Sequence, residues 1–199
     1  MTEPSRAREI REAATELFYE RGYHGTSMRE IAARLNMRAP SLYNHLNSKQ
    51  QLLVDIIEGD VALITREFED ATATTDDVIE KFRRGFEVHV RHHMRYAHES
   101  KIAMTEVAAL EEPAQSQVKE MRRHYTELWR TLIENAVAEG RASTQSTNLA
   151  AYAIIDMGIG IARWFRPDGP VSEGTLAGTY CDFALSVIGA DSSPTRSRT

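Results

Sequence analysis

The chain has 199 residues, of which 42% are hydrophobic and 27% charged, and its net charge is −5 at pH 7. This composition is typical of a globular protein, and the single cysteine, Cys181, excludes an internal disulfide framework and a cysteine-based zinc site. The sequence has no apolar run near the roughly 20 residues of a membrane-spanning helix, and its polar first residues do not resemble a signal peptide. We therefore expect a cytoplasmic protein with no membrane partner.

Hydrophobic residues recur at spacings of three and four along the whole chain, which predicts an all-α fold. The first helix is expected at about 6–21, and Gly22 is suited to end it in a left-handed conformation. Ser27 and Glu30 have the spacing of a capping box, which predicts the start of a short second helix.

A third short helix is expected directly after the second. Asn36 stands at the sharp turn between them, because asparagine tolerates the left-handed conformation. Pro40 fits the first turn of the third helix, and Leu42 and Leu46 form its buried stripe. The segment 48–51, Ser-Lys-Gln-Gln, predicts a second capping box and a longer helix after it.

Longer helices are expected over the rest of the chain, at about 49–71, 77–98, 101–111, 113–139, 146–165 and 173–189. Gly140 fits the end of one of them, and Ser172 with Thr175 offers caps for the last. The domains expected are a three-helix domain at 1–48, a helical body at 49–190 and a disordered polar tail at 191–199.

Charge is distributed unevenly between these parts. Residues 1–49 carry eight Lys and Arg against six Asp and Glu, whereas the remainder carries 16 against 23. A basic amino-terminal segment on an acidic body indicates a local contact with nucleic acid.

The three short helices have the layout of a helix-turn-helix, in which the third helix enters the major groove of double-stranded DNA. The residues expected on or near the outward face of this helix are Arg38, Ala39, Pro40, Ser41, Asn44 and His45. An arginine there can read guanine and an asparagine can read adenine. The residues placed to contact phosphates are Thr26, Ser27, Tyr43 and Lys49. The alternative is a three-helix element that packs and binds nothing.

Several pairs at matching spacing connect this segment to a known family: Ala13-Ala14, Leu17-Phe18, Gly22-Tyr23, Thr26-Ser27, Ile31-Ala32, Leu42-Tyr43, His45 and Ser48-Lys49. On these residues the segment resembles the amino-terminal domain of the TetR/AcrR family of bacterial transcription regulators. The resemblance implies an all-helical homodimer with two DNA-binding heads and a ligand-binding body, released from a palindromic operator when a small molecule binds. Asn36, Arg38 and Leu46 depart from the common pattern without breaking it.

The last two helices offer apolar faces for pairing two chains into a four-helix bundle. The residues expected on these faces are Ala150, Ala153, Ile154, Met157 and Ile161 in the first helix, and Leu176, Ala177, Tyr180, Ala184 and Ile188 in the second. Gly158 and Gly160 would allow close helix approach. The alternative is that both faces only close the core of one chain.

The body contains methionine and aromatic residues suited to an irregular apolar ligand. The candidate ligand-binding residues are Phe86, His89, His93, Met94, Tyr125, Trp129, Asp156, Gly160, Arg163 and Trp164. The segment 163–169 is similar to a branch of the family that senses acyl-CoA thioesters. Arg163, Trp164 and Arg166 offer basic and aromatic groups for the nucleotide end of such a ligand. A drug-like or aromatic effector, with control of an efflux pump, is the rival interpretation.

His89 and His93 are four residues apart on one helix, a spacing that could also bind a metal in a helical enzyme. Glu87 and the distant Glu106 are the further ligands on offer, and neither is a clear one. The sequence also shows neither a nucleophile–base pair nor a phosphate-binding loop. We therefore expect no metal site, no cofactor and no catalytic activity, and interpret these histidines as half-exposed or pocket-lining.

Overall fold

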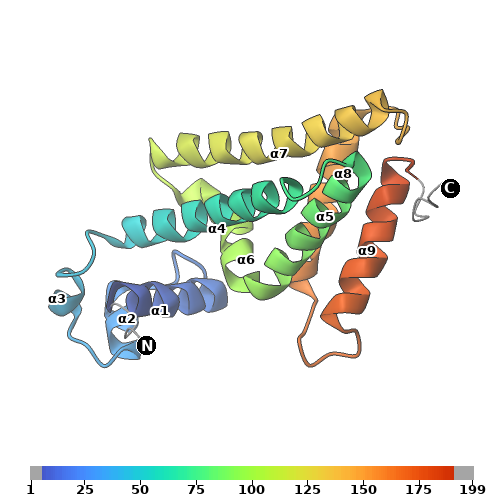
Figure 1. The fold of residues 1–199 in the computed structure, drawn as a ribbon. Helices are drawn as coiled ribbons and strands as arrows, with labels where there is room; N and C mark the ends of the chain where they lie inside the picture. The colour runs from blue at the N-terminus through green and yellow to red at the C-terminus, as the bar shows by residue number, and fades with distance from the viewer. Residues whose placement is uncertain (1–5, 191–199) are drawn as a thin grey trace. The chain divides into compact units, whose positions relative to one another are not determined.

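The structure is a computed structural model that describes residues 6–190; the predicted tail at 191–199 lies outside the described residues. The α-helices are α1 (Arg6–Arg21), α2 (Met28–Arg34), α3 (Ala39–Leu42), α4 (Lys49–Thr72), α5 (Val78–Arg95), α6 (Ala97–Thr105), α7 (Ala114–Ala138), α8 (Thr147–Ile159) and α9 (Glu173–Val187). Two short 3₁₀ helices are η1 (Val107–Ala109) and η2 (Gly160–Arg163). Within residues 6–190 there is no strand, so the predicted all-α fold is confirmed (Figure 1).

Local signals placed most helix ends correctly. The capping box of α2 is complete, since the Ser27 side chain accepts from the Glu30 amide and the Glu30 carboxylate accepts from the Ser27 amide. Gly22 and Asn36 adopt positive φ angles of 76° and 53°, as their places at turns predicted. Ser172 caps α9 by accepting from the Thr175 amide at 3.2 Å.

Other boundaries differ from those predicted. The second capping box is only half formed, because Ser48 accepts from the Gln51 amide while the Gln51 side chain bonds to Asp55. The segment expected as one helix at 146–165 is α8 followed by η2, and α5 gives way to α6 at Tyr96 rather than near residue 100.

The chain forms two compact units that do not follow the predicted division at residue 48. Among the described residues, the first comprises 6–63 and 96–122, and the second comprises 64–95 and 123–190. Helices α4 and α7 are therefore divided, each with one part in either unit.

The first unit has its own hydrophobic core, and in this unit α1 packs against α2 and α6 (Figure 1). Its largest fully buried side chains include Phe18, Leu42 and Leu53. A buried polar group also joins its helices: Ser100 of α6 donates to Asp60 of α4 at 3.3 Å, and the Arg122 guanidinium of α7 donates to the carbonyl oxygen of Ala103.

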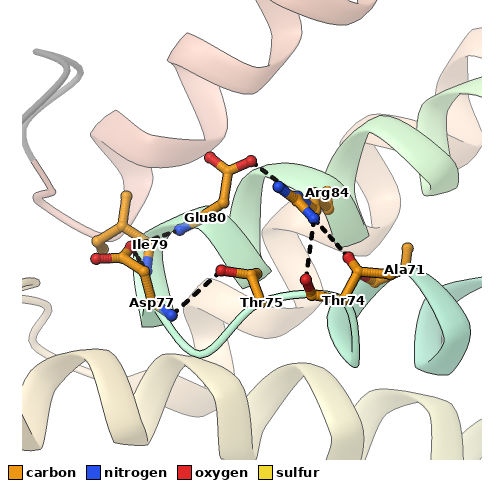
Figure 2. A network of polar contacts seen from close by, with 7 residues as sticks. All are labelled: Ala71, Thr74, Thr75, Asp77, Ile79, Glu80 and Arg84. Atoms are coloured by element: carbon orange, nitrogen blue, oxygen red, sulfur yellow. Dashed lines mark hydrogen bonds and ion pairs between the residues drawn. The ribbon is translucent and has the colours of Figure 1, made fainter.

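The second unit is built on α5, which packs against both α8 and α9 (Figure 1). Figure 2 shows how the loop before α5 fixes its start. Asp77 caps α5 by accepting from the amides of Ile79 and Glu80, and these bonds lower the pKa of the Asp77 carboxyl, the Glu80 bond most strongly. From the next turn, Arg84 donates to Thr74 and Glu80.

Candidate nucleic-acid interface and ligand site

The outward face predicted for the third helix is present in the first unit. Leu42 is fully buried in the core, whereas Arg38 and Asn44 are exposed and Ser41 is half-buried. Leu46, expected to be hidden, is only partly buried against the same core. The segment therefore presents polar groups of the type that read base edges, while one leucine fixes it to the unit.

The remaining predicted base-facing residues lie at the same surface: Pro40 and His45 are exposed and Ala39 is half-buried. The helix itself is shorter than predicted, because α3 ends at Leu42 instead of near residue 46. Arg38 is at its N-cap without a side-chain capping bond. After α3, the backbone amide of His45 donates to the Leu42 carbonyl at 2.9 Å, which forms a turn of 3₁₀ type.

Thr26 is a correction to the predicted phosphate contacts. Its side chain is 2% exposed, and its hydroxyl donates to the carbonyl oxygens of Leu17 and Gly22. Thr26 therefore holds the end of α1 to the turn that follows, and its hydroxyl is not available to a phosphate.

The other three predicted phosphate contacts remain at the surface. Ser27 and Tyr43 are exposed, and Lys49 is half-buried at the start of α4. The Lys49 ammonium lies 4.1 Å from the centroid of the Tyr23 ring, and burial lowers the pKa of Lys49. Such a position is typical of a cation–π contact.

Sequence reasoning missed residues that support this surface. Arg29 is exposed on α2, two residues after the Ser27 cap, and is a further cation beside the predicted contacts. Tyr23 and Gln50 are joined by a hydrogen bond of 2.7 Å between side chains 27 residues apart. Arg29 could have been found from its charge and place after the cap; the Tyr23–Gln50 pair has no signal in the sequence.

In the second unit, six of the ten predicted ligand residues come together in the core. These are Phe86, His89, His93, Met94, Tyr125 and Trp129, and all six are buried. The rings of Phe86 and Trp129 each lie about 6 Å from that of His89, at 6.1 and 5.9 Å between centroids. The Trp129 indole nitrogen is buried and has no hydrogen-bond partner within the described residues.

His89 connects three helices of this unit. Its Nε2 lies 3.0 Å from the Ile155 carbonyl oxygen of α8, and its Nδ1 lies 2.9 Å from the Tyr125 hydroxyl of α7. Because a carbonyl can only accept, the Nε2–H donates to Ile155 and the Nδ1 accepts from Tyr125. Burial lowers the pKa of His89 to about 4, so the ring is neutral at pH 7.

Both ring nitrogens of His89 are thus used within the unit, which disfavours a metal bound between His89 and His93. Among residues 6–190 there is also no group of three or more His, Cys, Asp or Glu side chains that could hold a metal ion. The same part of the chain contains no helix that is both long and apolar enough to cross a membrane.

Four predicted ligand residues lie elsewhere. Asp156, expected to need a partner inside an apolar helix, is exposed on α8, so its carboxylate is solvated. Arg163 and Trp164 are also exposed, and Gly160 is half-buried at the start of η2. The periodicity of α8 and η2 did not reveal which face the core would cover.

The predicted pairing faces of α8 and α9 are largely wrong. Their residues Ala150, Ile154, Ile161, Leu176, Ala177, Ala184 and Ile188 are buried in the core of the same chain; Met157 and Tyr180 are half-buried, and only Ala153 is exposed. Gly158 likewise packs against a residue of the same chain, because a Cβ there would lie 2.1 Å from the His89 ring. The apolar side chains left at the surface are others: Leu149, Tyr152, Phe183 and Val187.

A three-helix head with an exposed polar recognition segment, together with a helical body, defines a helix-turn-helix DNA-binding protein. Two family models match the chain: residues 10–56 match "Bacterial regulatory proteins, tetR family", and residues 75–188 match "Tetracyclin repressor-like, C-terminal domain". The chain belongs to the TetR family of bacterial transcription regulators, which confirms the resemblance stated from the sequence.

The chain is also similar to individual members of this family. It is 25% identical over 190 residues to the HTH-type transcriptional repressor KstR2 of Mycobacterium tuberculosis, covering 92% of this chain and 93% of that protein. A tetR-family regulatory protein from Rhodococcus RHA1 matches at a TM-score of 0.88 and 26% identity, over 94% of this chain and 99% of the other. AibR, solved with isovaleryl coenzyme A and operator DNA, matches at a TM-score of 0.83 and 25% identity, over 94% and 100%.

Proposed function

We propose that the protein is a homodimeric repressor that leaves a palindromic operator when an acyl-CoA thioester binds its helical body. One observation supports DNA binding most directly: Leu42 is buried while Arg38 and Asn44, on the same short segment, face solvent. Two such heads related by a two-fold axis would read half-sites about one helical turn apart, roughly 34–36 Å.

The buried cluster around His89 supports an effector with both apolar and polar parts. Phe86, Met94 and Trp129 offer apolar contacts, and the Trp129 indole N–H is a donor without a partner in residues 6–190. A thioester carbonyl is an acceptor that this donor could bond, and a buried donor left unpaired is costly. AibR, which is similar over almost the whole chain, was solved in complex with isovaleryl coenzyme A, a thioester of this class.

A groove of about 340 Å³ between α4, α5 and α7 of the second unit supports a route to this cluster. Its apolar lining includes Phe68, whose ring lies 4.7 Å from that of Trp129. Its polar lining includes Lys81 and His124 but also Glu69 and Glu127, and Glu69 lies 3.8 Å from His124. The charge of the groove therefore does not distinguish a CoA thioester from an uncharged aromatic drug.

The homodimer is supported by apolar side chains at the surface of α8 and α9. Leu149, Tyr152 and Phe183 are 70%, 56% and 53% exposed, and exposed apolar groups of this size mark interaction surfaces. We expect the 22.5 kDa chain to sediment as a dimer and Phe183→Glu to sediment as a single chain. Met104→Glu, an equal change on α6, is the control and should leave the dimer intact. A wild-type protein that sediments as a monomer at micromolar concentration would contradict the proposed dimer.

Base reading and phosphate contact can be separated by two substitutions. We expect Asn44→Ala to lose discrimination at one operator position by about 1–3 kcal/mol, because an asparagine pairs with one base. Lys49→Ala should instead weaken binding to all sequences and lower the slope of affinity against salt by about one per head. Binding isotherms on a set of single-base operator variants measure both. Equal losses on every sequence for both variants would contradict these roles.

The proposal as a whole is tested with DNA from the region upstream of the protein's own gene. Fluorescence anisotropy should show affinity that falls steeply with salt and favours that DNA over a scrambled duplex. Isovaleryl coenzyme A should release the DNA, and free coenzyme A should not. Release by aromatic drugs alone would favour the efflux-sensor alternative, and binding with neither salt slope nor sequence preference would exclude the repressor.

A further inference from the structure

Tyr23 lies at the centre of a set of contacts that the DNA-binding function does not by itself require. Its ring packs edge-on against buried Phe18 at 5.4 Å and carries the Lys49 ammonium over its face at 4.1 Å. The ring thus packs on the core and also holds the cation predicted to meet a phosphate.

The polar groups of Tyr23 bond to residues that are not predicted to contact DNA. Its hydroxyl donates to the Gln50 side-chain oxygen at 2.7 Å, and the Gln50 amide donates to the Ala109 carbonyl of η1 at 3.3 Å. The backbone amide of Tyr23 donates to the Glu106 carboxylate at 3.4 Å, at the end of α6. These residues all belong to the first compact unit.

We propose that Tyr23 is a positioning residue of the DNA interface: its ring holds the Lys49 ammonium where it meets a phosphate, and its hydroxyl ties that ring to η1 through Gln50. This inference rests on the proposed DNA binding. It assigns Tyr23 no contact with DNA.

The physical reason is the freedom of a lysine side chain. A lysine at a surface samples many rotamers, and this entropy is lost when the ammonium is held by a phosphate. A ring under the ammonium restricts it before DNA arrives, and the partial burial of Lys49 weakens its competing hydration. Because Gln50 follows Lys49 directly on α4, a shift of η1 would move the ring and the lysine together.

The test compares Tyr23→Leu, which removes the ring, with Tyr23→Phe, which removes only the hydroxyl. The readout is the slope of log affinity against log salt on a duplex of about 30 base pairs, long enough for two half-sites. Tyr23→Leu should lose more than half of the slope that Lys49→Ala loses, whereas Tyr23→Phe should keep the wild-type slope. Added to Lys49→Ala, Tyr23→Leu should lower the slope no further.

The chain provides a matched control in a second pair of the same kind. The Lys101 ammonium lies 4.1 Å over the Tyr19 ring, which also stacks on His98 of α6. Tyr19→Leu removes an equivalent ring from α1 and should leave the salt slope unchanged. A merely structural loss would weaken binding by the same factor at every salt concentration and would appear in both leucine variants.

A measurement without DNA keeps the proposal testable if Tyr23→Leu does not fold. The chain has only four lysines, so the ¹³C resonances of the methylated protein can be assigned by single lysine substitutions. The Lys49 methyl signal should be shifted upfield by the Tyr23 ring, as we also expect for the Lys101 signal above Tyr19, and should keep that shift in Tyr23→Phe. A Lys49 signal at the position of a free lysine overturns the proposal.

The outcomes separate this inference from the proposed function. Wild-type protein that does not bind the DNA removes the function and the inference together. Wild-type protein that binds with a steep salt slope, while Tyr23→Leu binds with the same slope, overturns only the role of Tyr23. A slope loss by Tyr23→Leu that adds fully to that of Lys49→Ala overturns it as well.

Discussion

Gly158→Ala is expected to lower the free energy of unfolding by about 3 kcal/mol, combining the strain of overpacking with the loss of buried hydrogen bonds. The new Cβ would lie 2.1 Å from Cδ2 and 2.3 Å from Nε2 of His89. His89 is fully buried, so its ring can move only by breaking its bonds to Ile155 and Tyr125. Urea denaturation of the purified protein measures the change.

The control for this substitution is Gly178→Ala in α9. An added Cβ at Gly178 meets no atom within 4 Å, and this glycine also lies within a helix. Because alanine is favoured over glycine inside helices by about 0.5–1 kcal/mol, this variant should be as stable as wild type or more so. Equal stability losses in both variants would show that the contact with His89 is not the cause.

Acid should destabilise the protein through its buried histidines. Burial lowers the pKa of His89 from 6.5 to about 4 and the pKa of His93 well below 6.5, where the nearby His89 and His92 add to the effect. Between about pH 4 and 6.5 the unfolded chain therefore binds more protons than the folded one. The stability conferred by neutral His89 is complete above pH 6.5 and is lost as the pH falls toward 4, by about 2 kcal/mol at pH 5.

The measurement is the difference in unfolding free energy between pH 7.5 and pH 5, both above the usual range of carboxyl pKa values. His89→Gln cannot titrate but keeps a donor and an acceptor, so it should lose much of this difference while the contribution of His93 remains. His124→Gln replaces an exposed histidine of α7 and should retain the wild-type difference. Wild type and His89→Gln with the same pH dependence would exclude the assigned role of His89.

Features that depend on neighbours within one helical turn could be predicted from the sequence alone. It predicted the bounds of α1, the positive φ of Gly22 and Asn36, and the capping box of Ser27 and Glu30. Together with the family resemblance, it also predicted that Arg38 and Asn44 are exposed and that Leu42 is buried in the core. Capping, turn conformation and helical periodicity act over three or four residues, so the sequence carries them in full.

The partner that each side chain meets depends instead on how distant helices pack together. His89 is satisfied by groups 36 and 66 residues away, Thr26 is buried by the end of α1, and Tyr23 reaches Gln50 and Glu106. In α8 and α9 periodicity located apolar residues, but the face that the core covers is set by packing against α5. Apolar area is buried where helices from distant parts of the chain pack together, and a local sequence pattern does not predict which helix faces meet.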